Sequence, residues 1–252
     1  MEKITFIRKG PEEVMRLQIR EGVPFLTFPS FEKTGLVKHG FSTRLGGVST
    51  GDCASMNFAR GRGDEAANIQ ENYRRMAAAL EADMSRMVLS WQTHTVNIRR
   101  VTEEDAGKGV VRDRDYRDID GLMTDVPGIT LVTSYADCVP LFFIDPVRRV
   151  IASSHSGWRG TVGRMGQRTV EAMEQAYGCR PEDFIAGIGP SICAACYEVG
   201  EDVAEAFAAG WGQALPADVL KPYPGRPGKY HLDLQRANER ILQKAGIKAE
   251  NI

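Results

Sequence analysis

The chain has 252 residues, of which 42% are hydrophobic and 26% are charged, and its formal net charge at pH 7 is −1. These values are typical of an ordinary globular protein, and so small a charge gives no electrostatic support for nucleic acid or an anionic membrane as a partner. We therefore expect a single domain over residues 1–252 with a small molecule as partner. The oligomeric state does not follow from the sequence.

The cysteine content bears on the cellular compartment. The chain contains five cysteines, an odd number, and it has no apolar run of 18 residues. Its first residues mix charged with apolar side chains, so they lack the hydrophobic centre of a secretion signal. An odd number of cysteines in a chain of this length also argues against a secreted disulfide framework. These features predict a protein of the reducing cytoplasm.

The N-terminal region predicts short strands followed by a loop. Residues 1–30 alternate apolar with polar side chains, and a further strand is expected at 36–41. The next segment, 42–51, is rich in glycine and predicts an irregular loop that contains Arg44. A guanidinium in such a loop is suited to planar contacts with an oxyanion. The simpler alternative is an ordinary surface turn.

The next part of the chain predicts a helix, a strand and a charged loop. Apolar residues recur at helical spacing from 65 to about 82, and Asp64 is expected to cap this helix. A buried strand at 87–92 follows, and His94 lies just beyond its end. A single histidine in that position is more often structural than a metal ligand. The charged segment 103–120 is interpreted as a solvated loop with no assigned chemistry.

The centre of the chain combines buried-strand patterns with chemically capable groups. The runs 139–144 and 150–154 are short and rich in β-branched residues, and a turn pattern between them predicts a hairpin. Cys138 precedes the first strand and His155 follows the second, so we expect both side chains at one rim of the sheet. The glycine-containing turn 156–160 then leads into a helix, where backbone N–H groups attract anions.

The C-terminal third predicts helices around one further strand. Helical spacing continues beyond Gly160 to a C-cap at Gly178, and 184–188 has the pattern of a buried strand. Further helices are expected at 201–209 and at about 232–245. The strands and helices alternate without a regular βαβ period, so the expected fold is α+β (mixed α/β), with a mixed β-sheet core and helices packed on it.

His94, Cys138 and His155 form a set that three chemistries could use. Two imidazoles and a thiolate leave the fourth position of a tetrahedral zinc ion open, as in catalytic zinc sites. Cys138 could instead be the nucleophile of a hydrolase with a histidine as base, and copper binds the same donors as zinc. The ordinary alternative is that Cys138 is a small buried apolar residue. Spacing alone leaves these alternatives open.

A Cys-x-x-Cys pair at Cys193 and Cys196 also bears on metal and redox chemistry. A structural zinc site with four cysteines needs two such pairs, and the chain contains only this one. The role of the pair is therefore left undetermined.

Eight sequence blocks lie in unbroken order between about residue 36 and residue 245. They are Thr43-Arg44-x-Gly46-Gly47-Val48-Ser49, Ser55-Met56-Asn57, Gln92-Thr93-His94, Asp120-Gly121, Ala136-Asp137-Cys138-x-Pro140, His155-Ser156-Gly157-Trp158-Arg159-Gly160, Gly189-Pro190-Ser191-Ile192 and Cys196-Tyr197-Glu198-Val199. Together they resemble the laccase-domain family, also called multicopper polyphenol oxidase-like or YfiH-like proteins. The resemblance implies a YfiH-like single domain with a Zn²⁺ site formed by His94, Cys138 and His155, with Cu²⁺ as the alternative metal.

The resemblance also implies a function. It indicates a zinc-dependent purine nucleoside phosphorylase that acts on adenosine, inosine and 5′-methylthioadenosine and also deaminates adenosine, with nucleoside and phosphate as small-molecule partners. Arg44, Asn57 and Arg159 are the positions expected to bind substrate or phosphate. The alternatives are a Cys-His hydrolase (amidase) and a copper-dependent polyphenol oxidase.

The chain departs from the family pattern at two places. Ser156 stands where alanine is commoner, a small change that we expect to leave the metal site intact. The sequence stops at Ile252, where similar proteins continue into a segment with an Arg-Arg pair and a Gly-Arg pair. We therefore expect a C-terminal segment to be missing.

Overall fold

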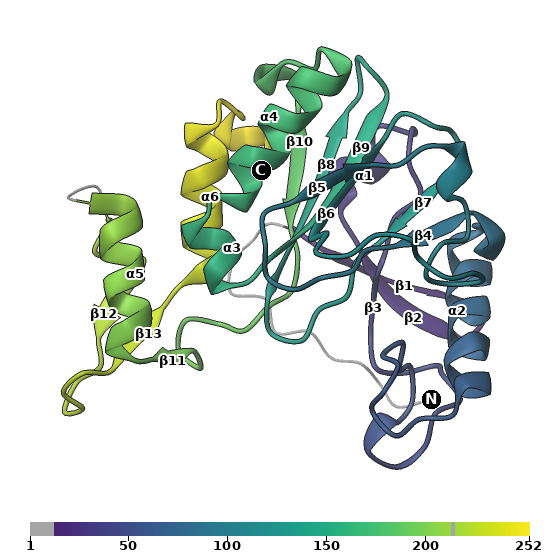
Figure 1. Ribbon diagram of the computed structural model, residues 1–252, viewed down its shortest axis with the longest axis horizontal. Coiled ribbons are helices and arrows are strands. Elements are labelled where there is room, and N and C mark those ends of the chain that lie inside the picture. Colours follow the sequence, from purple (N-terminus) through teal and green to yellow (C-terminus); the bar gives the residue numbers. More distant parts are fainter. Residues whose placement is uncertain (1–12, 213–214) are drawn as a thin grey trace.

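A five-stranded mixed sheet lies at the centre of the computed structural model, which describes residues 13–212 and 215–252 (Figure 1). Its strand order is β10-β8-β9-β6-β5, in which β5 and β6 are parallel and the other pairs are antiparallel. The strands are β5 (Ile98–Arg100), β6 (Gly121–Thr124), β8 (Val139–Asp145), β9 (Val150–Ser156) and β10 (Ile185–Ile188). The predicted hairpin is confirmed as β8 and β9, and the mixed sheet confirms the predicted α+β fold.

The β8 strand is buried on both faces, which explains its continuous apolar sequence. Leu141 and Phe143 belong to the main hydrophobic core, where they meet helices α4 (Met165–Tyr177) and α6 (Leu234–Lys244). Ile144, on the alternate face, packs with aromatic residues of the N-terminal region. A strand buried on both sides loses the alternation of apolar and polar residues that marks a half-exposed strand.

Smaller elements surround this sheet. Figure 1 shows α3, α4 and α6 together on one side of the central strands and α2 on the other side of the molecule. The remaining strands are β1 (Arg16–Arg20), β2 (Val23–Thr27), β3 (Phe41–Ser42), β4 (Met87–Leu89), β7 (Thr130–Val132), β11 (Glu198–Val199), β12 (Leu220–Pro222) and β13 (Tyr230–Leu232). The remaining α-helices are α1 (Pro29–Glu32), α2 (Ala66–Leu80), α3 (Trp158–Val162) and α5 (Glu201–Trp211). Short 3-10 helices occupy Gly51–Cys53, Met84–Arg86, Glu103–Asp105, Pro181–Asp183 and Ala249–Asn251.

Several predicted boundaries in the N-terminal half were wrong. The strand expected at 36–41 is present only from Phe41, where β3 pairs with β2, and the His39 side chain before it accepts a hydrogen bond from the backbone N–H of Phe28. The buried strand expected at 87–92 ends at Leu89. The predicted strands of residues 1–30 are confirmed as β1 and β2, and the part before residue 13 lies outside the described residues.

Two predicted helix features also differ. The N-cap of α2 is Glu65 rather than Asp64, because the Asp64 carboxylate instead accepts hydrogen bonds from Ser49 and Asn57. The single helix expected after Gly160 is two helices, α3 and α4, and Arg164 between them has a positive φ of 59°. The predicted end of α4 at Gly178 is confirmed.

The charged segment 103–120 is only partly a solvated loop. Asp105 and Lys108 are 2% and 8% exposed, and the Lys108 ammonium lies 2.8 Å from one Asp105 carboxylate oxygen. Tyr116 is also buried and donates a hydrogen bond to the carbonyl of Leu89 at 2.6 Å. Lys108 therefore pairs with Asp105 and Asp115, while apolar groups of the segment fill space beside β4.

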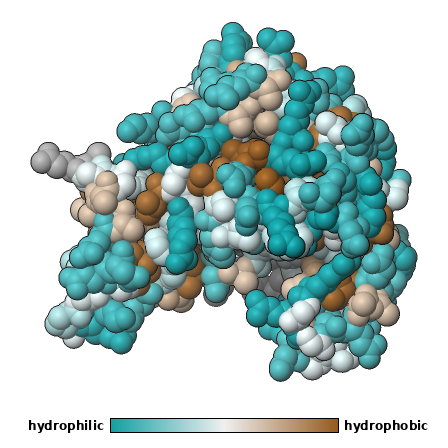
Figure 2. Space-filling view, viewed as in Figure 1, coloured by the Kyte–Doolittle hydropathy of each residue, from teal (hydrophilic) through white to brown (hydrophobic). Residues whose placement is uncertain are grey.

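Hydrophilic residues cover most of the face shown in Figure 2, and hydrophobic residues form small separate areas there. The exposed large hydrophobic side chains of the described residues are Val14, Ile19, Leu36, Val111 and Val147. Isolated apolar residues of this kind are normal at protein surfaces. Across the ranges 13–212 and 215–252, no helix has both the length and the apolar content needed to span a membrane.

The environment of His39 predicts that acid destabilises the fold. Its ring lies against Phe28 and Phe31, with centroids 6.0 and 5.1 Å away, and burial lowers the pKa of His39 from 6.5 to about 4. The folded protein therefore resists a proton that the unfolded chain accepts, and stability should fall as the pH decreases from about 6.5 towards 4. We expect this group to remove roughly 2 kcal/mol from the free energy of unfolding over that range.

Urea unfolding of the wild type and His39→Gln at pH 7 and pH 4.5 measures this effect. The variant should be less stable at pH 7 but lose less stability on acidification, because glutamine does not titrate. An equal loss of stability in both proteins would show that His39 does not control the acid response.

Candidate metal centre

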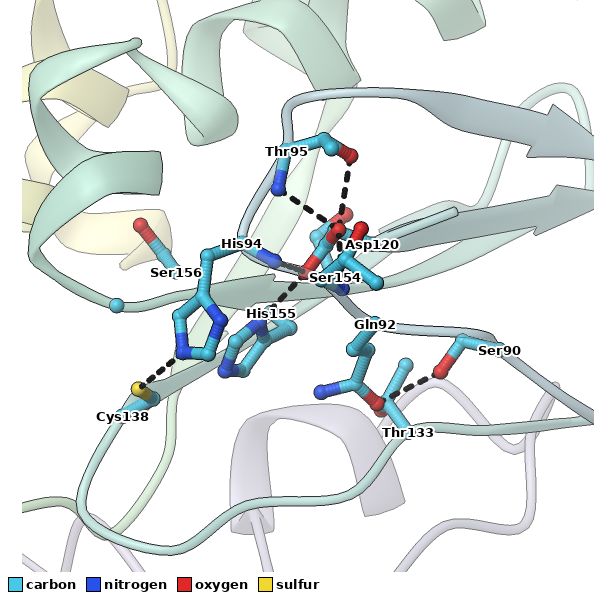
Figure 3. A network of polar contacts seen from close by, with 12 residues as sticks. Ser90, Gln92, His94, Thr95, Asp120, Thr133, Cys138, Ser154, His155 and Ser156 are labelled. Atoms are coloured by element: carbon cyan, nitrogen blue, oxygen red, sulfur yellow. Dashed lines mark hydrogen bonds and ion pairs between the residues drawn. The ribbon is translucent and has the colours of Figure 1, made fainter. Parts of the chain in front are cut away.

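The three predicted donors lie together at the ends of strands, as Figure 3 shows. Cys138 directly precedes β8, and His155 belongs to β9, where it pairs with Pro140 across the hairpin. His94 comes from the connection between β4 and β5. One nitrogen from each imidazole and the Cys138 sulfur all lie within 4.8 Å of one another, and Cys138 Sγ is 3.9 Å from His94 Nε2. The folded chain therefore brings together groups that are far apart in sequence.

A buried carboxylate, Asp120, organises both histidines. Its side chain is 0% exposed and lies 2.8 Å from Nδ1 of His155. The same carboxylate accepts hydrogen bonds from the backbone N–H groups of Thr93, His94 and Thr95 at 3.1, 3.0 and 2.9 Å, and from the Thr95 hydroxyl at 2.8 Å (Figure 3). His94 has a positive φ of 65°, and these bonds hold its backbone in that conformation. The role of Asp120 was not predicted from the sequence, where its only indication was the Asp-Gly block before a strand.

The hydrogen bond with Asp120 selects the form of His155. Burial by itself lowers the pKa of His155, but the hydrogen bonds with Asp120 and Cys138 outweigh it and raise this pKa to about 9. Despite burial, the hydrogen bonds that Asp120 accepts keep the pKa of its carboxyl at about 2. In His94, burial first, and then the charges of His155 and Arg159, lower the pKa. Metal-free His155 is therefore protonated near neutral pH, and a metal ion would displace the proton from Nε2 while Nδ1 continues to donate to the carboxylate.

The loop that carries Cys138 is attached on two sides. Gln92 accepts a hydrogen bond from the backbone N–H of Ser134 at 2.7 Å and donates one to the Ser134 carbonyl at 2.6 Å. On the other side, the backbone N–H of Ile192 donates to the Asp137 carbonyl at 3.0 Å. Gln92 belongs to one of the eight sequence blocks, but no role was predicted for it from the sequence. These contacts fix Cys138 relative to His94.

Gly157 allows the donors to approach closely. A Cβ atom on Gly157 would lie 2.7 Å from Cys138 Sγ and 3.2 Å from a ring carbon of His94, so a larger residue would push these side chains away. The requirement for glycine in the block His155-Ser156-Gly157 is therefore steric.

The donor set fits zinc. Zinc bonds of about 2.0–2.3 Å to nitrogen and sulfur in a tetrahedral arrangement require donor atoms about 3.3–3.7 Å apart, close to the 3.9 Å between Cys138 and His94. Two imidazoles, a thiol and a carboxylate behind one imidazole are typical of zinc sites that keep one open position. Copper binds the same donors, so these residues alone do not identify the metal.

The three predicted substrate-binding residues lie in two different parts of the structure. Arg44 and Asn57 line a cavity of about 370 Å³ together with Thr133, Ser134 and Tyr135. Asn57 uses its side chain locally, since it donates to Asp64 at 2.8 Å and accepts from the backbone of Ala59 at 3.0 Å. The Arg44 guanidinium donates to the carbonyl of Ala54 at 3.1 Å.

Arg159, in contrast, lies beside the metal donors. Its charge contributes to the lowered pKa of His94, and its guanidinium stacks over the Trp158 ring at 4.3 Å. An anion-binding turn was predicted at the start of this helix, but α3 has only five residues. A helix this short has a weak dipole and attracts an anion only weakly. Any attraction of an anion to this side of the site therefore depends mainly on Arg159.

The Cys-x-x-Cys pair lies outside the group of donors. Cys193 and Cys196 are exposed, and a turn joins them through a hydrogen bond from the Cys196 N–H to the Cys193 carbonyl at 3.0 Å. Within the described part of the chain, His94, Cys138 and His155 are the only group of three or more His, Cys, Asp or Glu side chains placed to hold a metal ion.

The fold and this site define an α+β protein with a candidate mononuclear metal centre of two imidazoles and one thiol. The chain belongs to the family described as multi-copper polyphenol oxidoreductase laccase, whose model matches residues 38–252. This match confirms the family recognised from the eight sequence blocks.

Individual relatives agree with this assignment. The chain is 41% identical over 227 residues to a protein of Deinococcus radiodurans named purine nucleoside phosphorylase, covering 90% of this chain and 80% of the relative. It is 34% identical over 214 residues to a protein of an unknown prokaryotic organism named adenosine deaminase RL5, covering 84% and 80%. The crystal structure of Bacillus licheniformis hypothetical protein YfiH has a TM-score of 0.85 and 30% identity, covering 94% of this chain and 86% of that one. The expected YfiH-like fold is thereby confirmed.

Proposed function

We propose that this protein is a zinc-dependent purine nucleoside phosphorylase that also deaminates adenosine. The observation that carries the proposal is the group of His94, Cys138 and His155 backed by Asp120, in a chain whose relatives have these two names. In phosphorolysis, a phosphate oxygen attacks C1′ of the ribose while the bond from C1′ to the purine nitrogen breaks. Adenosine, inosine and 5′-methylthioadenosine are the proposed substrates.

Each residue has a proposed part in this reaction. A bound zinc ion would supply Lewis acidity where the three donors meet. Asp120 holds the tautomer of His155 and the backbone of His94, and Arg159 attracts phosphate to the same side. The donors and Asp120 already lie within contact distance of one another, and Arg159 acts on this group through its charge.

The purine base is proposed to enter the 370 Å³ cavity. Its volume is within the range for small-molecule sites. The Tyr135 ring, which lines it, has its centroid 5.9 Å from that of His155 and 6.0 Å from that of Phe41. Aromatic side chains favour stacking with a planar heterocycle. Arg44 and Asn57, which were expected to bind phosphate or substrate, are proposed to shape the wall of this cavity.

The two alternatives are less well supported, but for different reasons. Multicopper oxidation needs several metal ions, whereas the described residues contain a single group of three donors. The hydrolase alternative has one specific observation in its favour, because Asp120, His155 and Cys138 also resemble a catalytic triad in which the carboxylate orients the base. The two mechanisms therefore differ in whether the Cys138 thiolate is a metal ligand or a free nucleophile.

The proposed function is tested with zinc-loaded protein, inosine and phosphate. Chromatography should detect hypoxanthine and ribose 1-phosphate in equal amounts, and adenosine in phosphate-free buffer should yield inosine and ammonia. Absence of nucleoside turnover with both zinc-loaded and copper-loaded protein would refute the proposal. Release of ammonia from an amide substrate by metal-free protein would favour the hydrolase.

Arg159→Ala and Arg44→Ala provide a matched comparison within this assay. Arg159→Ala should raise the KM for phosphate at least about tenfold with a much smaller effect on deamination, since one charge-assisted contact is lost. Arg44→Ala removes the same charge from the cavity wall and should leave the KM for phosphate within about twofold. The reverse result would return the phosphate site to Arg44.

A further inference from the structure

A second cavity, of about 640 Å³, lies in the segment that connects β5 to β6 and is surrounded by arginine. It is separate from the metal centre, because none of the three donors contributes to its lining. Its lining includes Arg60, Arg112, Arg114 and Arg117 beside the indole of Trp91, together with two carboxylates, Asp113 and Asp115.

The four guanidiniums around this cavity have no carboxylate partner among the described residues. Instead, Arg112 donates to the carbonyls of Ala106 and Glu104, and Arg114 donates to the carbonyl of Ser90. Arg60 similarly reaches the carbonyl of Val110 at 3.4 Å. Bonds to neutral carbonyls leave the positive charges uncompensated.

The carboxylates compensate for little of this charge. Asp115 lies 2.9 Å from the ammonium of Lys108, so its charge is shared with a fifth cation. This leaves Asp113 as the one lining carboxylate available to offset four guanidiniums. The cavity is therefore strongly positive although the whole chain is nearly neutral.

Two of the arginines are held in place by the indole. The guanidinium carbons of Arg114 and Arg117 lie 4.3 and 5.2 Å from the Trp91 ring centroid. Stacking of this kind limits side-chain motion and keeps the planar donor groups available to a ligand. Arg114 is partly buried, and this burial lowers the pKa of its guanidinium. A charge removed from water in this way is stabilised by an anion.

We propose that this cavity binds a diphosphate group, as in inorganic pyrophosphate or a nucleoside diphosphate. Guanidinium donors match the geometry of phosphate oxygens, and each phosphate group can accept bidentate bonds. A single phosphate carries about two negative charges, too few to compensate four guanidiniums, whereas two linked groups reach more of them at once. This site does not depend on the nucleoside phosphorylase function.

Isothermal titration of the zinc-replete protein with inorganic pyrophosphate tests the site. The wild type should show one saturable site, and the double variant Arg112→Ala/Arg117→Ala should bind at least about tenfold more weakly because two charge-assisted contacts are lost. Both residues are exposed, so the fold should persist, and circular dichroism checks that it does. The matched control is Arg149→Ala/Arg168→Ala, which removes the same charge from two exposed arginines elsewhere and should bind like the wild type.

Four results would overturn the proposal. The first is the absence of saturable binding by the wild type, and the second is an equal loss of affinity in both double variants, which would indicate a general charge effect. The third is equal affinity for inorganic phosphate or sulfate, because a single tetrahedral anion should bind at least about tenfold more weakly than pyrophosphate. Cys138→Ser should bind pyrophosphate with wild-type affinity, and a loss of binding in that variant would place the ligand at the metal centre.

Discussion

Cys138→Ser is expected to lower the zinc content of the purified protein from about one ion per chain to near zero, and nucleoside phosphorolysis should fall at least about a hundredfold with it. A serine hydroxyl does not ionise near neutral pH, so only the two imidazoles would remain as donors. Elemental analysis of the purified protein together with the inosine assay measures both effects. His94→Ala and His155→Ala should give the same paired loss, because each removes one ligand from a three-ligand site.

Cys53→Ser is the matched control for this substitution. The Cys53 thiol is only partly buried and contacts the carbonyl of Arg62 at 3.6 Å, outside the group of metal donors. Its replacement should leave zinc content and activity at wild-type values. Loss of zinc from this variant would indicate a general effect of cysteine replacement.

Alkylation separates a ligand from a nucleophile at Cys138. A zinc-bound thiolate should react slowly with iodoacetamide until a chelator removes the metal, because its lone pair is engaged. A thiolate activated by His155 should react rapidly with or without chelator, and Cys138→Ser should then abolish turnover with no stoichiometric metal to lose. Wild type that is free of metal and fully active would refute the ligand assignment.

Asp120→Asn is expected to weaken zinc binding about 10- to 100-fold, as is usual when a carboxylate behind a metal-binding histidine is lost. The amide has nearly the same shape, but its NH₂ group would face N–H groups that now donate to the carboxylate from Thr93, His94 and Thr95. Leaving buried donors without an acceptor should also lower the free energy of unfolding by about 1–3 kcal/mol. Competition with a chromogenic chelator measures zinc affinity, and urea unfolding of the metal-free protein measures stability.

Asp118→Asn provides the control for this variant. Asp118 is exposed, and its carboxylate accepts a hydrogen bond from the Thr93 hydroxyl at 2.7 Å. Among the described hydrogen bonds, none joins its carboxylate to either imidazole. The zinc affinity of the Asp118→Asn variant should stay within about twofold of that of the wild type. Folded Asp120→Asn with wild-type zinc affinity would show that the carboxylate has no part in positioning the donors.

Local patterns in the sequence determined the parts of this protein that depend on neighbouring residues. The hairpin of β8 and β9 was predictable because apolar, β-branched runs and an intervening turn are encoded within about 20 residues. That hairpin already placed Cys138 and His155 at one rim, and the order of eight blocks identified the family. His94 entered the predicted set because it follows a predicted strand, and the resemblance then assigned it as a metal ligand, since its spacing alone carried little information.

Only the tertiary structure revealed the role of Asp120 and the separation of the substrate candidates. Asp120 lies 26 residues from His94 and 35 residues from His155, and no periodicity relates hydrogen-bond partners at such separations. Arg44 and Asn57 belong to recognised blocks, yet their side chains serve a loop and a cavity wall. Segment 103–120 was predicted to be solvated throughout, whereas ion pairing such as that of Lys108 with Asp105 allows part of it to be buried. Sequence patterns report what each residue prefers locally, whereas burial, charge pairing and ligand geometry depend on which distant segments meet.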